Sequence, residues 1–125
     1  MYELTVDTHF DAAHSLRNYP GECARLHGHT WGVAVSVQAE ILSELGLSID
    51  FKTIASVLND IVRRFDHKTL NDMEEFSELN PTAENLARLL FELISEKINN
   101  KTIRVCSVTV TEGERYHVTY KKEEK

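Results

Sequence analysis

Two long segments near the N-terminus, in which apolar residues alternate with other residues, constrain the fold more than any other feature. Residues 2–14 and about 27–40 both follow the two-residue period of a β-strand. The apolar faces of the two segments consist of Tyr2, Leu4, Val6, Phe10 and Ala12 in the first and Trp31, Val33, Val35, Val37 and Ala39 in the second. Asn18, Pro20 and Gly21 between them predict a loop. We therefore expect two strands, each with one buried face.

The middle and the end of the chain predict two helices followed by a hairpin. The apolar residues with helical spacing are Ile54, Val57, Leu58, Ile61, Val62 and Phe65 in one stretch and Leu86, Leu89, Leu90, Leu93, Ile94 and Ile98 in the other. Asp50 and Thr82 stand where the N-caps of these helices are expected. Residues 102–112 and 116–120 alternate again, around a short glycine-containing turn. Residues 121–125 are expected to form a solvated tail.

This order of elements predicts a single α+β domain over residues 1–125. The succession strand, strand, helix, helix, strand, strand indicates an antiparallel four-stranded sheet with two helices on one face. No repeat or Pro/Ser-rich linker divides the chain. The second face and the edges of such a sheet need cover, and another copy of the chain is the expected cover.

Charge and composition argue against several classes of function. A net charge of −6 disfavours a general nucleic-acid-binding protein, which would carry a basic stripe. No apolar run approaches the roughly 20 residues needed to span a bilayer, and the first residues lack the pattern of a signal peptide. Cys23 and Cys106 are expected to stay reduced in a cytoplasmic protein, with Cys106 in the core among valines. We thus expect no nucleic-acid partner and no membrane association.

Three histidines lie in phase with the apolar faces of the two N-terminal segments. His14 ends the first segment, and His27 and His29 begin the second. If the two segments pair as a hairpin, the three imidazoles meet beside the connecting loop. Three histidines with an open fourth position are typical of catalytic zinc, although imidazoles accept other divalent ions as well. With Cys23 as a fourth ligand, the same residues would instead form a closed structural site.

Two further groups have the chemistry of acids and bases, each with a structural alternative. Glu112 ends an apolar row that includes Val108 and Val110, so its carboxylate faces the interior and must be paired. It is either an ion-pair partner or an anchor for a donor-rich ligand. Asp66 can orient the neighbouring His67, or the histidine can simply interact with the end of the preceding helix.

Taken together, these residues resemble the family of 6-pyruvoyltetrahydropterin and 6-carboxytetrahydropterin synthases. The resemblance runs over nearly the whole chain, and its marks are Phe10-Asp-Ala-Ala-His14, Cys23-x-x-x-His27-Gly-His29, Asp66-His67-Lys-Thr-Leu-Asn71, Asn80-Pro-Thr-Ala-Glu84 and Glu112. It implies the tunnelling fold, in which strands of three subunits close a barrel and two trimers stack as a homohexamer. It also implies active sites at subunit interfaces.

The resemblance implies a role for each candidate residue as well. His14, His27 and His29 would hold Zn²⁺, Cys23 would be the base, His67 oriented by Asp66 would relay a proton, Glu112 would anchor the pterin ring, and Thr82 would lie near it. Zinc would lower the pKa of a substrate hydroxyl. The substrate would be 7,8-dihydroneopterin triphosphate, for whose phosphates Arg17, Arg25 and Lys68 are candidates by position.

The loop before His27 distinguishes branches of the family. The compact Cys-Ala-Arg-Leu-His-Gly-His loop favours the branch that releases acetaldehyde and triphosphate to leave 6-carboxy-5,6,7,8-tetrahydropterin, for queuosine and other deazapurines. The alternative is 6-pyruvoyltetrahydropterin synthase, which eliminates triphosphate on the way to biopterin. A third branch carries glutamate where this chain has Ala24. Outside these lyases, a non-catalytic zinc-stabilised binding module and a metal-free dihydroneopterin aldolase remain as alternatives.

Overall fold

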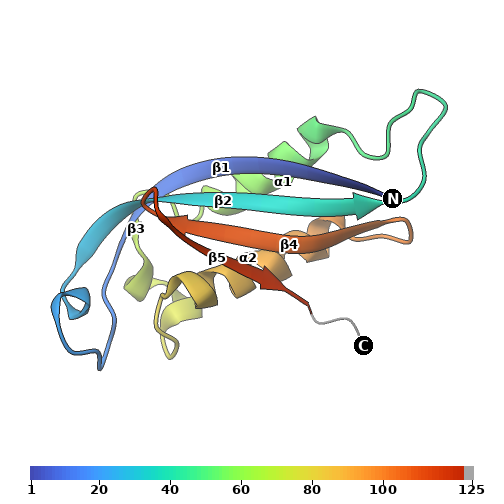
Figure 1. Cartoon of the computed structure of the whole chain (residues 1–125). Coiled ribbons are helices and arrows are strands. Elements are labelled where there is room, and N and C mark those ends of the chain that lie inside the picture. The colour runs from blue at the N-terminus through green and yellow to red at the C-terminus, as the bar shows by residue number, and fades with distance from the viewer. Residues whose placement is uncertain (123–125) are drawn as a thin grey trace.

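A computed structural model describes residues 1–122, and the rest of the predicted C-terminal tail lies outside the described residues. Five strands and two helices are arranged in one sheet with a helical layer (Figure 1). The strands are β1 (Tyr2–His14), β2 (His27–Ala39), β3 (Lys68–Thr69), β4 (Ile103–Glu112) and β5 (Tyr116–Lys121). The helices are α1 (Phe51–Val62) and α2 (Ala83–Ile98), with short 3-10 turns η1 (Glu22–Ala24), η2 (Leu70–Asp72) and η3 (Glu74–Phe76). No helix within residues 1–122 is long and apolar enough to cross a membrane.

The sheet has five strands in the order β3-β1-β2-β4-β5, so the predicted number of four is wrong. β1 and β2 pair along their full length, from Tyr2 opposite Ala39 to His14 opposite His27. β4 and β5 extend the antiparallel ladder, whereas β3 pairs parallel to β1 and makes the sheet mixed. β3 contains only two residues, which is too short for the alternation that reveals a strand in a sequence. The predicted α+β class with two helices is confirmed.

Both helices lie against one face of the sheet, as the sequence predicted (Figure 1). α1 packs on β1, while α2 packs on β4 and β5. The predicted N-caps are present: the Asp50 side chain accepts a hydrogen bond from Lys52 N, and that of Thr82 accepts one from Asn85 N. The core between the layers is centred on Trp31, which is fully buried and stacked on Phe10 with 6.4 Å between ring centroids.

A β-bulge in β4 moves Cys106 away from the core position that the sequence predicted. Val105 pairs with Val37 and Ser107 pairs with Ser36, so the chain holds one extra residue between them. The Cys106 side chain is therefore only half-buried, and its Sγ donates to the carbonyl oxygen of Ser36 at 3.2 Å. Burial raises the pKa of this thiol to about 11. Cys106 is consequently a poor nucleophile at neutral pH.

The loop between β1 and β2 is held in place by two asparagine side chains. The Asn71 amide exchanges two hydrogen bonds with the backbone of Ser15, at 2.8 and 2.9 Å. Asn80 does the same with the backbone of Arg17, at 2.8 and 3.0 Å. The Arg17 guanidinium in turn donates to the carbonyl oxygens of Leu79 and Asn71. Arg17, a candidate for phosphate binding by position, is thus engaged in fixing this loop.

Asn80→Ala is expected to reduce the free energy of unfolding by about 1–3 kcal/mol, because it leaves a part-buried N–H and C=O of Arg17 without partners. Urea denaturation followed by circular dichroism would measure the change. Asn59→Ala, on the exposed face of α1, is the matched control and should change stability by less than about 0.5 kcal/mol. Equal effects of the two substitutions would show that Asn80 does not fix the loop.

Candidate metal centre

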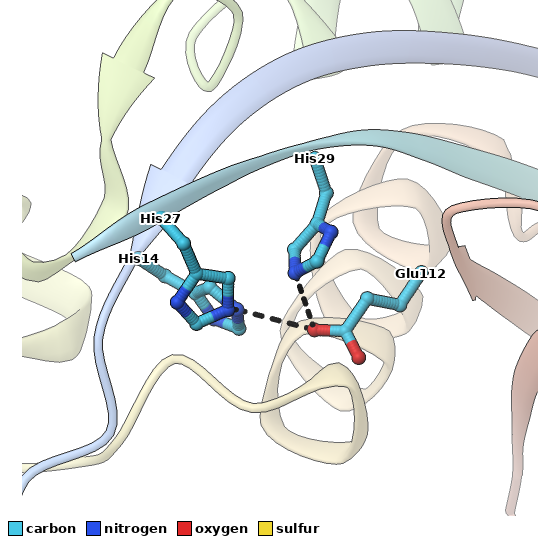
Figure 2. A group of neighbouring side chains, drawn as sticks. All are labelled: His14, His27, His29 and Glu112. Atoms are coloured by element: carbon cyan, nitrogen blue, oxygen red, sulfur yellow. Dashed lines mark hydrogen bonds and ion pairs between the residues drawn. The ribbon is translucent and has the colours of Figure 1, made fainter. Parts of the chain in front are cut away.

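Four side chains from three neighbouring strands converge at the end of the sheet that carries the β1–β2 loop (Figure 2). His14 and His27 face each other in the β1–β2 pairing, and His29 follows on the same side of β2. Glu112 reaches the group from the end of β4, where it pairs with Trp31. One ligand atom from each of these four residues lies within 4.8 Å of the other three. The predicted meeting of the three histidines therefore occurs within a single chain.

Hydrogen bonds to the backbone decide which ring nitrogens face the centre. Nδ1 of His14 lies 2.7 Å from the carbonyl oxygen of Pro81, and Nδ1 of His27 lies 2.7 Å from that of Arg25. A carbonyl oxygen can only accept, so both Nδ1 atoms carry the proton. Both Nε2 atoms are then left with a lone pair, and they point toward each other at a separation of 3.1 Å. Carbonyl partners of this kind orient histidine ligands in metal sites.

These groups fit a divalent cation. Two lone pairs at 3.1 Å, with a carboxylate oxygen beside them, require positive charge between them. Zinc–nitrogen bonds of about 2.0–2.1 Å in a tetrahedral arrangement place ligand atoms about 3.3–3.4 Å apart, close to the separations seen here. Burial lowers the pKa of His29 below its ordinary value, which keeps this imidazole neutral and able to bind a metal ion. The cluster is consistent with a metal site.

Trp31 supports the cluster from the core side. Its ring makes edge contacts with His14 and His29, with centroids 4.9 and 5.5 Å apart. The indole Nε1 donates to the carbonyl oxygen of Ala12 at 3.2 Å, which fixes the plane of the ring. Since His14 is only 2% exposed, it is held between the indole and the Pro81 carbonyl. The histidines are therefore positioned by the core and by the α2 entry loop together.

A cavity of about 770 Å³ lies beside the cluster. Its lining includes His14, Glu112, Cys23, Thr82, Arg115 and Tyr116. Cys23 sits in η1 with its side chain exposed, and it does not belong to the group whose atoms could share one ion. Glu112 takes that fourth place instead. Thr82 both caps α2 and borders the cavity. The prediction that it is the N-cap and the expectation that it lies near the ligand are therefore compatible.

Asp66 and His67 lie apart from this cavity, on the other side of β1. The Asp66 Oδ2 is 3.0 Å from Nδ1 of His67, and its Oδ1 accepts from the backbone N–H of Asp11 at 2.9 Å. That backbone bond is the main reason why the pKa of Asp66 is lowered. His67 has a left-handed backbone, with φ of 58°, and its N–H donates to the carbonyl oxygen of Asp11. The residue thus pairs with Asp66 beyond the end of α1 and does not cap the helix.

The chain is similar in sequence to proteins that act on pterins by name. The sequence profile of 6-pyruvoyl tetrahydropterin synthase matches residues 3–123. The chain belongs to this family. A 6-carboxy-5,6,7,8-tetrahydropterin synthase of Bacillus subtilis is 37% identical over 97 residues, which are 73% of this chain and 64% of the relative. A dihydroneopterin monophosphate aldolase of Pyrococcus furiosus is 32% identical over 109 residues, covering 87% and 88% of the two chains.

Solved structures show the same fold. The 6-pyruvoyl tetrahydropterin synthase of Caenorhabditis elegans superposes with a TM-score of 0.87, at 24% sequence identity, over 98% of this chain and 96% of that structure. At this identity the similarity concerns the fold alone. The tetrahydropterin synthase architecture is therefore shown by structure and the family membership by sequence.

The structure also identifies cavity residues that the sequence did not single out. Among residues 1–122, Arg115 is the only lysine or arginine that lines the cavity next to the histidine cluster. It lies in the β4–β5 turn, and turn residues carry no periodic signal that would have marked it. The Pro81 and Arg25 carbonyls that orient the histidines could not be predicted from the sequence either, because every residue has a carbonyl group.

Proposed function

We propose that the chain is a zinc-dependent lyase of the 6-carboxytetrahydropterin synthase type. It would convert 7,8-dihydroneopterin triphosphate and one water molecule to 6-carboxy-5,6,7,8-tetrahydropterin, acetaldehyde and triphosphate. The observation that carries the proposal is the convergence of three histidine Nε2 atoms beside a cavity that also exposes a thiol and a carboxylate. The 37% identical relative with this activity in its name supports the choice of branch.

Each candidate residue of the cluster and of the cavity beside it has a task that its chemistry allows. His14, His27 and His29 would hold zinc, which would polarise a side-chain hydroxyl of the pterin when bound. Cys23 presents an exposed thiol at the cavity and would take the proton from the carbon next to that hydroxyl. Glu112 would accept hydrogen bonds from the donor edge of the pterin ring, with Thr82 at the border of the ring site.

Asp66 and His67 would serve the active site of a neighbouring copy. In one chain they lie by β3, at one edge of the sheet, whereas the cavity reaches β5 at the opposite edge. Continuing the sheet from copy to copy would bring the His67 edge of one subunit beside the cavity of the next. Asp66 holds Nδ1 of His67, which leaves Nε2 free to relay a proton. From the family resemblance we also propose a homohexamer built as a dimer of trimers, from single domains of residues 1–125.

A dihydroneopterin aldolase is the second candidate, because the 32% identical relative from Pyrococcus furiosus has that activity in its name. An aldolase would split the side chain so that the phosphate leaves on the released aldehyde. A 6-pyruvoyltetrahydropterin synthase would release triphosphate but no aldehyde, and a non-catalytic zinc module would return the substrate unchanged. The products of the reaction therefore distinguish the four candidate functions from one another.

The experiment is to incubate the zinc-loaded protein with 7,8-dihydroneopterin triphosphate and to identify products by mass spectrometry. We expect a carboxylated tetrahydropterin, free triphosphate and acetaldehyde in equal amounts. A product with a pyruvoyl side chain, formed without acetaldehyde, would assign the protein to the 6-pyruvoyltetrahydropterin synthase branch. A phosphorylated aldehyde would favour the aldolase, which would then be tested with the monophosphate. Recovery of intact substrate would reject the lyase proposal.

Cys23→Ala is expected to lower turnover by at least about 100-fold while the zinc content stays at the wild-type level, because the thiol lines the cavity without joining the ligand cluster. Stopped assays and metal analysis of the dialysed protein would measure the two quantities. Cys106→Ala is the matched control, since that thiol lies outside the cavity lining and should change neither quantity. Loss of zinc from Cys23→Ala would instead indicate a closed structural site.

A further inference from the structure

We infer that Asn71 and Asn80 are positioning residues, which fix the place of the Cys23 thiol beside the histidine cluster. The hydrogen bonds that support this arrangement do not depend on the reaction. Its catalytic consequence rests on the proposed function, because it requires that Cys23 is the base.

Cys23 lies in a loop that projects beyond the end of the sheet (Figure 1). The carbonyl oxygen of Cys23 accepts a hydrogen bond of 2.9 Å from the backbone N–H of Leu16. In the described part of the chain, the other hydrogen bonds of η1 stay within the turn and its two flanking residues. Between Leu16 and Cys23 the chain reverses at Asn18 and Gly21, whose φ values are 59° and 103°. The place of the thiol therefore depends on the place of Leu16.

Both neighbours of Leu16 are held by an asparagine side chain. The Asn71 amide exchanges two hydrogen bonds with the Ser15 backbone. The Asn80 amide exchanges two with the Arg17 backbone. Each amide thus uses its oxygen as acceptor and its nitrogen as donor on one residue, which fixes a direction as well as a distance. Because Leu16 stands between two residues held in this way, its N–H is aimed at the carbonyl in η1.

The segment that carries Asn80 also holds the histidine cluster. The carbonyl oxygen of the next residue, Pro81, accepts a hydrogen bond from Nδ1 of His14 at 2.7 Å. The Asn80 carbonyl oxygen accepts from Nδ2 of Asn85 in the first turn of α2 at 2.9 Å, and Pro81 is buried. Two adjacent residues therefore hold both the loop with the thiol and a cluster imidazole. Together they set the separation between the thiol and the histidine cluster.

Asn71 attaches the same loop to a different part of the sheet. It lies in η2, directly after β3, and β3 pairs with β1. Besides the bonds from its amide to Ser15, its carbonyl oxygen accepts from the Arg17 guanidinium at 3.2 Å. The loop is thus attached on two sides, through Asn71 to the β3 edge and through Asn80 to the entry of α2.

Asn80 also lines the cavity, but its side chain is already engaged. Its oxygen and its nitrogen both bond to the Arg17 backbone, and a ligand would have to compete with those bonds. Loss of the amide should therefore affect the proton transfer by the thiol more than the binding of substrate. A displacement of a reacting group by about 1 Å can lower a rate by about 100-fold.

Asn80→Ala in the zinc-loaded protein should lower kcat on 7,8-dihydroneopterin triphosphate by about 10–100-fold and change KM by less than about twofold. Asn71→Ala should act in the same direction. Asn59→Ala, on the exposed face of α1, is the control and should keep both constants. All three variants should keep the zinc content of the wild type. A wild-type kcat in Asn80→Ala, an effect confined to KM, or loss of zinc would overturn the inference.

A double-mutant cycle shows whether the asparagine acts through the thiol. In the Cys23→Ala background, Asn80→Ala should lower the residual turnover by less than about twofold, because no thiol is left to position. Additive losses from the two substitutions would overturn the inference, since Asn80 would then act elsewhere. Unchanged turnover in Cys23→Ala alone would contradict the proposed role of the thiol, and with it the catalytic half of the inference.

Amide hydrogen exchange tests the arrangement without turnover. In Asn80→Ala the Leu16 amide should exchange at least about tenfold faster, because its bond to the Cys23 carbonyl depends on the anchored neighbours. Ile54→Val, which loosens the buried core, is the control for general destabilisation and should not single out Leu16. Unchanged protection of Leu16 in Asn80→Ala would overturn the inference whatever the turnover, so its failure and failure of the lyase assay are distinguishable.

Discussion

His27→Ala is expected to weaken zinc binding by more than about 100-fold and to abolish turnover. The substitution removes one of three Nε2 atoms around the centre, and loss of a direct ligand should exceed the 10–100-fold effect of losing a supporting group. Because His27 is only part-buried, the fold should remain intact. The measurement is the metal content of the dialysed protein together with the initial rate on 7,8-dihydroneopterin triphosphate.

His117→Ala is the matched control for this prediction. His117 lines the cavity beside the cluster, but it is exposed and its Nδ1 lies 3.0 Å from the hydroxyl oxygen of Thr111 on the neighbouring strand. Since it does not belong to the cluster, its loss should leave the zinc content unchanged. If His27→Ala kept a full complement of zinc, the metal would have to bind elsewhere and the proposed active site would be wrong.

Trp31→Ala is expected to have the largest effect on stability, a loss of about 3–5 kcal/mol in the free energy of unfolding. The indole is fully buried and packs on Phe10, and its Nε1–H bonds to the Ala12 carbonyl. Loss of the indole ring also removes the surface against which His14 and His29 pack. Zinc affinity should therefore fall together with stability. Denaturant unfolding with and without added zinc would measure both effects.

Trp31→Phe separates the packing of the ring from its hydrogen bond. Phenylalanine keeps the aromatic contacts but leaves the Ala12 carbonyl without its donor, which should reduce stability by about 1–3 kcal/mol. We therefore expect this variant to fall between the wild type and Trp31→Ala in both stability and zinc affinity. If Trp31→Ala lost less than about 1 kcal/mol, the indole would not be the centre of the core.

The cluster of three histidines could be predicted because it depends on local periodicity. Side chains alternate along a strand, so His14, His27 and His29 had to share the apolar faces of their segments. The N-caps at Asp50 and Thr82 were predictable for a similar reason, since a cap bonds to backbone only two or three residues away. In each case the interacting groups are close along the chain or follow a fixed repeat.

The remaining features depend on contacts between segments far apart in the sequence. The bulge that turns Cys106 away from the core exists only in the pairing of β4 with β2, and the alternation of β4 alone suggested the opposite side. β3 is a strand only because two residues happen to pair with β1. The carbonyls of Pro81 and Arg25 become partners of the histidines only when the loops are folded.

The sequence by itself thus determined the α+β class, the two helices, the family and the three histidines, because these follow from periodicity and from residue types at fixed spacings. The tertiary structure decided that Glu112 and not Cys23 lies in the fourth position of the cluster, and that Asp66 and His67 lie outside the cavity of their own chain. The physical reason is that strand order, register and the end of each strand set which side chains meet, and these are fixed by long-range pairing.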